Sequence, residues 1–336
     1  MSSTIHDVAR LAGVSFKTVS NVINDHPHVS DGTRAKVRAA IDELGYQPNL
    51  SARSLRSGRS GVIGLAVPEL SLAYFAQLAD EVIRAAERRG LVVLIEQTGG
   101  DRDKELAVLR SPRLQLTDGL LFSPLGLGSD DAALVDIPTP LVLLGERIFN
   151  GPTDHVTMQN VEAARAATEH LISKGRRRIA VVGAHEGEVI GSAGLRLTGY
   201  RQALDAAGIP FDESLLAYTG LWHRANGAEA TRQLLASGVS FDGVFAMNDE
   251  LGLGSMRVLQ EAGRVIPDDV AVIGFDDVDE GRYSIPSLST VDPGRREIAE
   301  TAVGVLIDRI AEKGETRAAP RELLSAFRIV ERESSL

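Results

Sequence analysis

Two groups of polar residues in this 336-residue sequence have the types and spacing needed to recognise another molecule. The first lies in "AGVSFKTVSNVIN", residues 12–24. At about 100° per residue, a helix over this stretch carries Val19 and Val22 on one side and Lys17 and Asn21 on the other. Ammonium and amide groups can hydrogen-bond to the edges of DNA bases. The stretch therefore predicts either a nucleic-acid recognition face or a polar face that only meets water.

Three short helices are predicted before residue 46. Thr4 is expected to cap the first, with Asp7 in capping-box position, Ser15 to cap the second, and Ser30 to cap a third that stops at Gly45. Two short helices joined by "AGVS" have the spacing of a helix-turn-helix, whose second helix lies in the major groove. A three-helix bundle whose polar face only meets water remains a comparable interpretation at this point.

The stretch "QPNLSARSLRSGRS" that follows predicts a helix of about eight residues, capped by Asn49. A helix this short is marginal in isolation, because nucleation costs more than so few hydrogen bonds return. Arg53 and Arg56 supply charge for phosphates, and Leu55 between them could enter the minor groove as a wedge. The alternative is a flexible polar linker, which leaves Leu55 unexplained.

The distribution of charge also separates this region from the rest of the chain. Residues 1–60 carry eight Lys or Arg and five Asp or Glu, a net charge of +3, whereas the remainder carries −13. A basic head on an acidic body can bind a polyanion locally, although the net charge of the whole protein is −10.

The run from "TIHDVARLAGVSFKTVSNVIN" through "GYQPNLSARSLRSG" resembles the DNA-binding head and hinge helix of the lactose-repressor (LacI/GalR) family. The resemblance implies that Phe16, Lys17 and Asn21 read bases, and that Leu55 is a minor-groove wedge on a hinge helix formed only against DNA and a dimer mate. Position 21 is often arginine in relatives, so the operator sequence stays open. The residues expected to contact DNA are Thr4, Ser15, Phe16, Lys17, Thr18, Ser20, Asn21, Asn24, Asn49, Ala52, Arg53, Leu55 and Arg56.

From Gly61 onward, short apolar runs alternate with helical stretches. "GVIGLAVP", "LVVLIEQT", "GLLFSP", "PLVLLGE", "RIAVVG", "GVFAMND" and "VAVIGFDD" predict buried parallel strands. The expected fold class is α/β, with a helix-turn-helix head, a hinge helix and two doubly wound lobes. The expected boundaries are 1–47 for the head, 48–60 for the hinge, 61–160 plus 292–320 for lobe 1, and 161–290 plus 321–330 for lobe 2.

The second group of polar residues follows the ends of these strands. Ligands of open sheets bind beyond the carboxyl ends of the strands, and aromatic faces with carboxylates and an amide suit a sugar or nucleoside. Singly, each residue has a structural alternative, since an Asp at a strand end usually caps the next helix. Resemblance to the same family extends over this region and implies an effector site related to periplasmic sugar-binding proteins. The residues expected to contact the effector are Tyr74, Phe75, Glu146, Arg196, Trp222, Asn248 and Asp276.

Other classes of protein fit less well. An enzyme is not expected, because no "GxxxxGK[ST]" or nucleophile-elbow pattern occurs and the seven histidines lack metal spacing. The sequence has no cysteine, and no cofactor or metal is expected. No stretch is apolar enough for a membrane helix, so we expect a cytoplasmic protein. A solute-binding receptor without DNA function is the alternative that the body alone would suit.

These observations predict a dimeric DNA-binding transcription regulator, a repressor, that binds a palindromic operator. A small polar effector in the cleft is expected to set the closure of the two lobes, and thereby the spacing of two hinge segments on DNA. The absence of a leucine-heptad tail after Arg328 favours a dimer over a tetramer.

Overall fold

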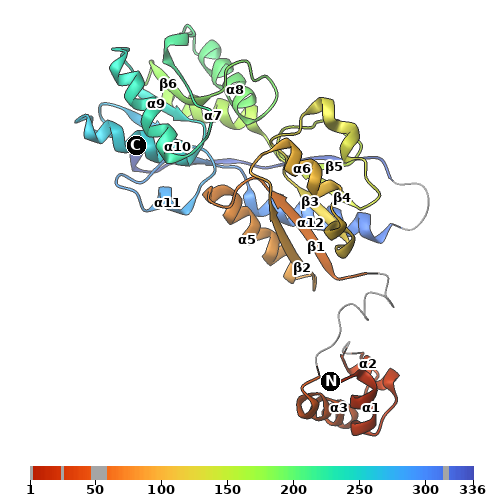
Figure 1. Cartoon of the computed structure of the whole chain (residues 1–336). Helices are drawn as coiled ribbons and strands as arrows, with labels where there is room; N and C mark the ends of the chain where they lie inside the picture. Colours follow the sequence, from red (N-terminus) through yellow and green to blue (C-terminus); the bar gives the residue numbers. More distant parts are fainter. Residues whose placement is uncertain (1–2, 24–25, 47–58, 313–317) are drawn as a thin grey trace. The chain divides into compact units, whose positions relative to one another are not determined.

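The computed structural model of the chain describes residues 3–23, 26–46, 59–312 and 318–336. The chain forms two compact units, the head unit (Met1–Gly61) and the body unit (Val62–Leu336) (Figure 1).

The head unit contains three helices at the predicted positions. They are α1 (Ile5–Ala12), α2 (Phe16–Ile23) and α3 (Asp31–Leu44). Apolar residues one helical turn apart on each helix meet in one small core, in which Val8, Val19 and Val37 are fully buried. The three-helix arrangement is therefore held by a single apolar stripe from each helix.

The predicted caps of these helices are confirmed. Thr4 and Asp7 form a capping box at the start of α1. The backbone N–H of Thr18 donates to Ser15 Oγ at 3.1 Å, and that of Thr33 donates to Ser30 Oγ. Each of these contacts satisfies an amide that a helix start leaves without a partner.

The first lobe of the body unit is built on a six-stranded parallel sheet of order β11-β5-β4-β3-β1-β2. Its strands are β1 (Val62–Val67), β2 (Val92–Gln97), β3 (Gly119–Phe122), β4 (Leu141–Leu144), β5 (Asp154–Met158) and β11 (Glu322–Ser325). Its helices are α5 (Ala73–Glu87), α6 (Arg102–Leu109), α12 (Arg295–Ala311) and the 3-10 helices η1 (Pro112–Leu116) and η2 (Ser129–Val135). Every residue of β3 and β4 is buried, as expected of strands covered on both faces.

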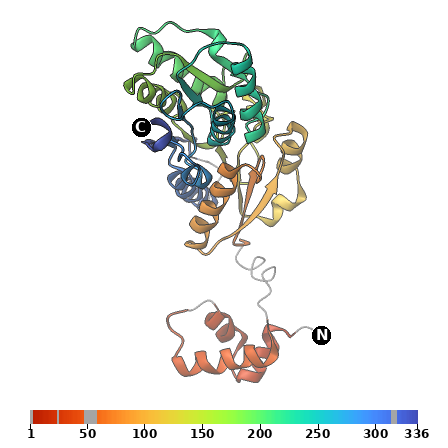
Figure 2. The same ribbon diagram turned by 90° about the vertical axis from the view of Figure 1, so that its left-hand side faces the viewer.

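The second lobe is built on a four-stranded parallel sheet of order β7-β6-β8-β9. Its strands are β6 (Ile179–Ala184), β7 (Leu216–Tyr218), β8 (Gly243–Ala246) and β9 (Ala271–Ile273). Its helices are α7 (Asn160–Ser173), α8 (Ser192–Ala206), α9 (Arg224–Ala236), α10 (Asp249–Glu261), α11 (Asp279–Arg282) and η3 (Glu213–Leu215). Within the body unit, Figure 2 shows the green elements of lobe 2 grouped apart from the orange and yellow elements of lobe 1.

The last part of the chain differs from the expected division of the lobes. We expected residues 321–330 in lobe 2, but β11 pairs with β5 in the lobe 1 sheet. The free edge of β5 offers a row of unpaired amides and carbonyls, which β11 satisfies. Only then does the chain cross to lobe 2, where β12 (Arg328–Val330) pairs antiparallel with β10 (Thr290–Asp292), followed by η4 (Glu333–Ser335).

One expectation about the strands is wrong. The apolar run that forms β2 was expected to be buried, yet Val92, Leu94 and Ile95 are 56%, 50% and 39% exposed. The reason is that β2 lies at the edge of the sheet, beyond β1. An apolar edge strand left open in this way is a surface available for pairing with another chain.

A buried ion-pair cluster fixes the opposite end of this sheet. Asp154, at the start of β5, is fully buried and receives hydrogen bonds from Arg309 of α12, one of them at 2.9 Å, and from Arg321 Nε at 3.1 Å. Burial favours the neutral form of Asp154, but the two guanidinium groups outweigh it and hold the pKa of the carboxyl below its usual range. Arg309 also donates to the carbonyls of Ala318 and Ala319, which lead into β11.

Candidate functional site

The exposed face of α2 carries only part of the predicted DNA-reading set. Lys17 is exposed and Phe16 is 48% exposed, with its ring 5.7 Å from that of His6 on α1. Asn21 is partly exposed one turn further along the helix. These three side chains therefore lie where they could meet the base edges of a major groove.

Other members of the set have structural roles or lie elsewhere. Ser20 was expected to face DNA, but it is only 7% exposed because its position on α2 turns toward the head core. The hydroxyls of Thr4, Ser15 and Thr18 take part in cap contacts. Six further residues lie outside the described part of the chain, and with them the predicted hinge helix: Asn24, Asn49, Ala52, Arg53, Leu55 and Arg56.

All seven residues predicted to contact an effector line one cavity of the body unit. Its volume is about 370 Å³, which is within the range of small-molecule sites. Both lobes contribute to its walls. Tyr74 and Phe75 lie in the first turn of α5, Glu146 follows β4, Trp222 follows β7, Asn248 follows β8, Asp276 follows β9, and Arg196 lies on α8.

Arg196 is the central buried cation of this cavity. Its side chain is 3% exposed, and its Nε donates to Asn160 Oδ1 at 2.8 Å. Its guanidinium lies 3.6 Å from the ring centre of Phe275 and 5.3 Å from that of Trp222, and its Nη2 is 3.8 Å from Asp276 Oδ1. Burial lowers the pKa of Arg196, and the facing carboxylates oppose that effect.

Asp276 provides the main carboxylate opposite Arg196. Burial raises its pKa to about 7, while Arg196 and Arg295 act in the other direction. Its backbone has φ 112°, which is a strained conformation for a residue with a side chain and is typical of functional sites. Burial also raises the pKa of the neighbouring Tyr74 phenol, with Glu146 and Asp276 adding to the shift.

Glu146 connects the two lobes across the cavity. Its Oε2 accepts from Ser192 Oγ of lobe 2 at 2.6 Å, and its Oε1 accepts from Thr157 Oγ1 of lobe 1 at 3.3 Å. A carboxylate held at both oxygens presents a fixed acceptor surface to a ligand hydroxyl. Its position depends on how closely the lobes approach each other.

Asn248 and Trp222 are held together by hydrogen bonds. Asn248 Oδ1 accepts from the backbone N–H of Leu251 at 2.8 Å, so this residue caps α10. Its Nδ2 donates to the Trp222 carbonyl at 3.1 Å, and Trp222 Nε1 donates to the Gly183 carbonyl at 2.9 Å. Asn248 therefore both caps α10 and holds Trp222 in the wall of the cavity.

The sequence missed several residues of the cavity rim. Glu69 of lobe 1 pairs with His223 of lobe 2 at 3.3 Å, and Arg147 of lobe 1 is 3.8 Å from Glu188 of lobe 2. His185 and Ser192 also line the cavity. Except for Ser192, which begins α8, they come from segments between helices and strands, so no periodicity could have marked them. Only their closeness in sequence to strand ends hinted at the site.

One rim loop is fixed by a buried carboxylate. Glu105 of α6 is fully buried and accepts from the backbone N–H groups of Leu125, Gly126 and Leu127 at 2.7, 3.0 and 2.8 Å. Leu125 lines the cavity and is 43% exposed. The course of this rim loop is thus set by backbone contacts.

No group of three or more His, Cys, Asp or Glu in the ranges above could hold a metal ion. Among those same residues, no helix combines the length and the apolar character needed to cross a bilayer.

Comparison with known proteins gives consistent matches over both units. Residues 4–49 match the family described as "Bacterial regulatory proteins, lacI family", and residues 168–335 match "Periplasmic binding protein-like domain". The ribose operon repressor of Escherichia coli strain K12 is 34% identical over 312 residues, which cover 92% of this chain and 94% of the relative.

Solved structures agree with these matches. A LacI-family structure from Sanguibacter keddieii is 58% identical with a TM-score of 0.77, covering 82% of this chain and 99% of that chain. The lac repressor dimer bound to operator and the anti-inducer ONPF has a TM-score of 0.82 at 28% identity over 100% of both chains. A CelR–cellobiose complex has a TM-score of 0.73 at 33% identity over 99% of both. The chain therefore belongs to the lacI family of bacterial regulatory proteins, and it is a DNA-binding transcriptional regulator rather than an enzyme.

Proposed function

We propose that this regulator represses transcription as a homodimer on a palindromic operator and that a sugar bound in the body cavity controls it. In this proposal residues 1–47 read DNA, residues 48–60 form the hinge and the remaining residues form the effector domain. The observation that carries it is the meeting of all seven predicted effector residues in one cavity with walls from both lobes.

The chemistry of the cavity favours a polyhydroxylated ligand. Carboxylates at Glu146 and Asp276 can accept from hydroxyls, Arg196 can donate to them, and the Trp222 face can stack on a pyranose ring. The similarity to a regulator solved with cellobiose supports this class. A nucleoside is the second candidate, because the Tyr74 and Phe75 rings lie edge to face at 5.2 Å and could enclose a planar base.

Binding of a ligand to both walls would favour one closure of the lobes. The chain passes between them three times, after β5, after β10 and after β11. A ligand that bridges Glu146 and Arg196 would stabilise the closed arrangement, and closure would change the spacing of the two hinges of a dimer. DNA binding and effector binding would then be thermodynamically linked.

The experiment that tests the effector proposal is a thermal-shift screen of the full chain against D-ribose, D-cellobiose and adenosine. A ligand that binds only the folded state raises the melting temperature. We expect a sugar to raise it for the wild type and not for Asp276→Asn. A shift that is equal in both proteins would place the ligand outside this cavity.

The proposed contact of Asn21 with an operator base predicts the effect of Asn21→Ala. The substitution removes an amide from the exposed face of α2, so we expect operator binding to weaken by roughly 1–3 kcal/mol and base preference to relax at one position of each half-site. The measurement is a fluorescence-anisotropy titration on an operator selected by the wild type from random DNA. Asn226→Ala on α9 of the body unit is the matched control, and equal losses on selected and random DNA would contradict base reading by Asn21.

The exposed apolar strand β2 predicts the dimer surface. Val92→Asp would place an unpaired charge in the interface, so we expect the dissociation constant of the dimer to rise by about thirty-fold, or roughly 2 kcal/mol. Sedimentation analysis of the full chain provides the measurement. Val265→Asp is the matched control, because Val265 is 54% exposed, compared with 56% for Val92. If both variants dimerise like the wild type, β2 is not the interface.

A further inference from the structure

The cavity carboxylate Asp276 belongs to a strained turn with Asp277. The two residues have φ 112° and 49°, so both adopt conformations that residues with a side chain rarely take. Asp276 lines the cavity, whereas Asp277 does not. Such a turn persists only where the surroundings hold it, so the groups that hold it decide where the Asp276 carboxylate points.

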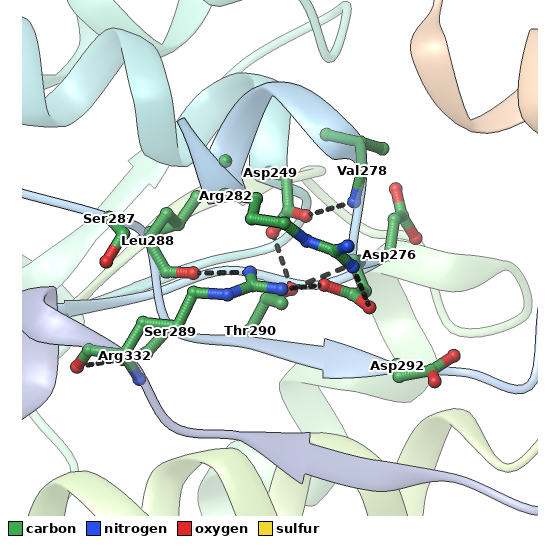
Figure 3. A network of polar contacts seen from close by, with 12 residues as sticks. Asp249, Asp276, Val278, Arg282, Ser287, Leu288, Ser289, Thr290, Asp292 and Arg332 are labelled. Carbon is green, nitrogen blue, oxygen red and sulfur yellow. Dashed lines mark hydrogen bonds and ion pairs between the residues drawn. The ribbon is translucent and has the colours of Figure 1, made fainter. Parts of the chain in front are cut away.

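Asp277 is held from outside the cavity by Arg332. The Arg332 Nη2 donates to Asp277 Oδ1 at 2.5 Å. Its Nη1 donates to the Leu288 carbonyl at 2.8 Å (Figure 3). The Arg332 backbone is fixed in turn, because its N–H donates to Ser289 Oγ at 2.8 Å and its carbonyl accepts from that hydroxyl at 2.9 Å. The Arg332 side chain is 11% exposed, and none of its contacts involves the cavity.

Other groups hold the same turn. Arg282 Nη2 is 3.9 Å from Asp277 Oδ2, and the Asp277 N–H donates to Thr290 Oγ1 at 3.3 Å. Arg295, at the start of α12 in lobe 1, donates to the carbonyl of Asp276 and, at 3.2 Å, to that of Asp277. On the other side, Asp249 accepts from the Val278 N–H at 2.9 Å and from Thr290 Oγ1 at 2.6 Å (Figure 3). The turn is therefore tied to lobe 1, to the core of lobe 2 and to the C-terminal segment.

Arg332 reaches this position only after the last crossing between the lobes. The chain leaves the lobe 1 sheet at β11, pairs with β10 through β12, and then brings Arg332 against Asp277. A change in the position of this segment would be transmitted to the turn through one charge-assisted hydrogen bond.

We infer that Arg332 is a positioning residue for effector binding, which acts through Asp277 to aim the Asp276 carboxylate into the cavity. The inference rests on the proposed function in one respect, namely that Asp276 contacts the effector. Arg332 does not line the cavity, so its effect on binding is exerted through the turn.

The cavity contains its own reporter of this geometry. Trp222 is the single tryptophan of the sequence, and the Arg196 guanidinium is 5.3 Å from its ring centre and 3.8 Å from the Asp276 carboxylate. Because the pKa of Asp276 is raised to about 7, Trp222 emission should titrate near neutral pH. The charged and titratable groups that face Asp276 are Arg196, Arg295, Glu146, Glu250, Tyr74 and Asp249. The Asp276→Asn protein defines the part of the emission change that does not come from Asp276.

The experiment compares Trp222 emission from pH 5.5 to 8.5 in the ligand-free full chain for the wild type and Arg332→Met. Without the Arg332–Asp277 contact the turn can relax and water can reach the Asp276 carboxylate. We therefore expect the Asp276-dependent midpoint of the emission titration to fall by about one pH unit. D-cellobiose affinity, followed by the same emission, should fall about tenfold. Arg332→Lys keeps the positive charge but cannot contact Asp277 and the Leu288 carbonyl at the same time. It should partly restore the midpoint and the D-cellobiose affinity.

Arg328→Met is the matched control, because Arg328 lies on the same segment and pairs with Asp292 at 2.9 Å on the surface. It should behave like the wild type. A midpoint for folded Arg332→Met equal to that of the wild type overturns the inference, as does a wild-type titration identical to that of Asp276→Asn. If Arg332→Met does not fold, the test uses Arg332→Lys and Asp277→Asn instead. Midpoints equal to the wild-type value in both of these variants overturn the inference. Failure of every variant to bind a sugar would refute the proposed effector while the midpoints still decide the role of Arg332.

Discussion

Asp276→Asn is expected to weaken effector binding by about 2–5 kcal/mol, because it leaves the buried Arg196 guanidinium without its facing carboxylate and removes an acceptor of ligand hydroxyls. A loss of this size corresponds to roughly thirty-fold to several thousand-fold in affinity. Isothermal titration of the full chain with the sugar found in the screen provides the measurement. Operator release by that sugar should require a correspondingly higher concentration.

The matched control is Asp279→Asn, which makes the same change at an exposed carboxylate on α11, three residues along the chain. Its affinity should equal that of the wild type. Operator affinity without sugar should be similar in all three proteins, because the head unit is unaltered. An affinity of Asp276→Asn within twofold of the wild type would remove Asp276 from the site.

Arg309→Met is expected to lower the free energy of unfolding of the body unit by about 3–5 kcal/mol, the typical loss when one partner of a buried ion pair is removed. The Arg309 side chain is 9% exposed and Asp154 is fully buried, so solvent cannot replace the lost contact. Urea denaturation followed by circular dichroism measures the loss. Arg257→Met is the control, because Arg257 is 74% exposed in its pair with Glu261 and should contribute less than about 0.5 kcal/mol.

The same cluster predicts a response to acid. Because the pKa of Asp154 is lower in the folded protein than in the unfolded chain, its stabilising contribution is present at neutral pH. It should be lost as the pH falls below 3.8 through the folded-state pKa. The stability difference between the wild type and Arg309→Met should therefore narrow in that range, and a difference independent of pH would contradict the role given to the pair.

The fold could be predicted where burial leaves a simple pattern. The runs that form β3, β4, β6 and β8 are apolar throughout because both faces of the sheets are covered. β5 escaped prediction because its sequence, "DHVTM", carries polar residues that are buried but partnered, such as Asp154. β2 has the apolar pattern of a central strand although it lies at an edge, and no local signal separates the two cases.

The site could be predicted from the rule that ligands meet the carboxyl ends of parallel strands, which brought residues as distant as Tyr74 and Asp276 together. The rule could not predict the residues that hold these side chains in place. Arg332 lies 56 residues after Asp276, and its contact with Asp277 follows from the crossing of the chain between lobes. Ser20 shows the opposite limit, since a helical projection alone did not indicate that this residue is buried.

The contact of Glu105 with the rim loop bears on how easily the ligand preference of this fold could be redesigned. The three donors to Glu105 are main-chain amides, which nearly every residue type supplies. Gly126 cannot change, because a Cβ there would lie 2.5 Å from the Arg102 nitrogen, and Leu127 is fully buried. Of these three residues, only Leu125 lines the cavity with a side chain that can be changed. It is therefore the position to randomise in a biosensor library that leaves the rest of the fold unaltered.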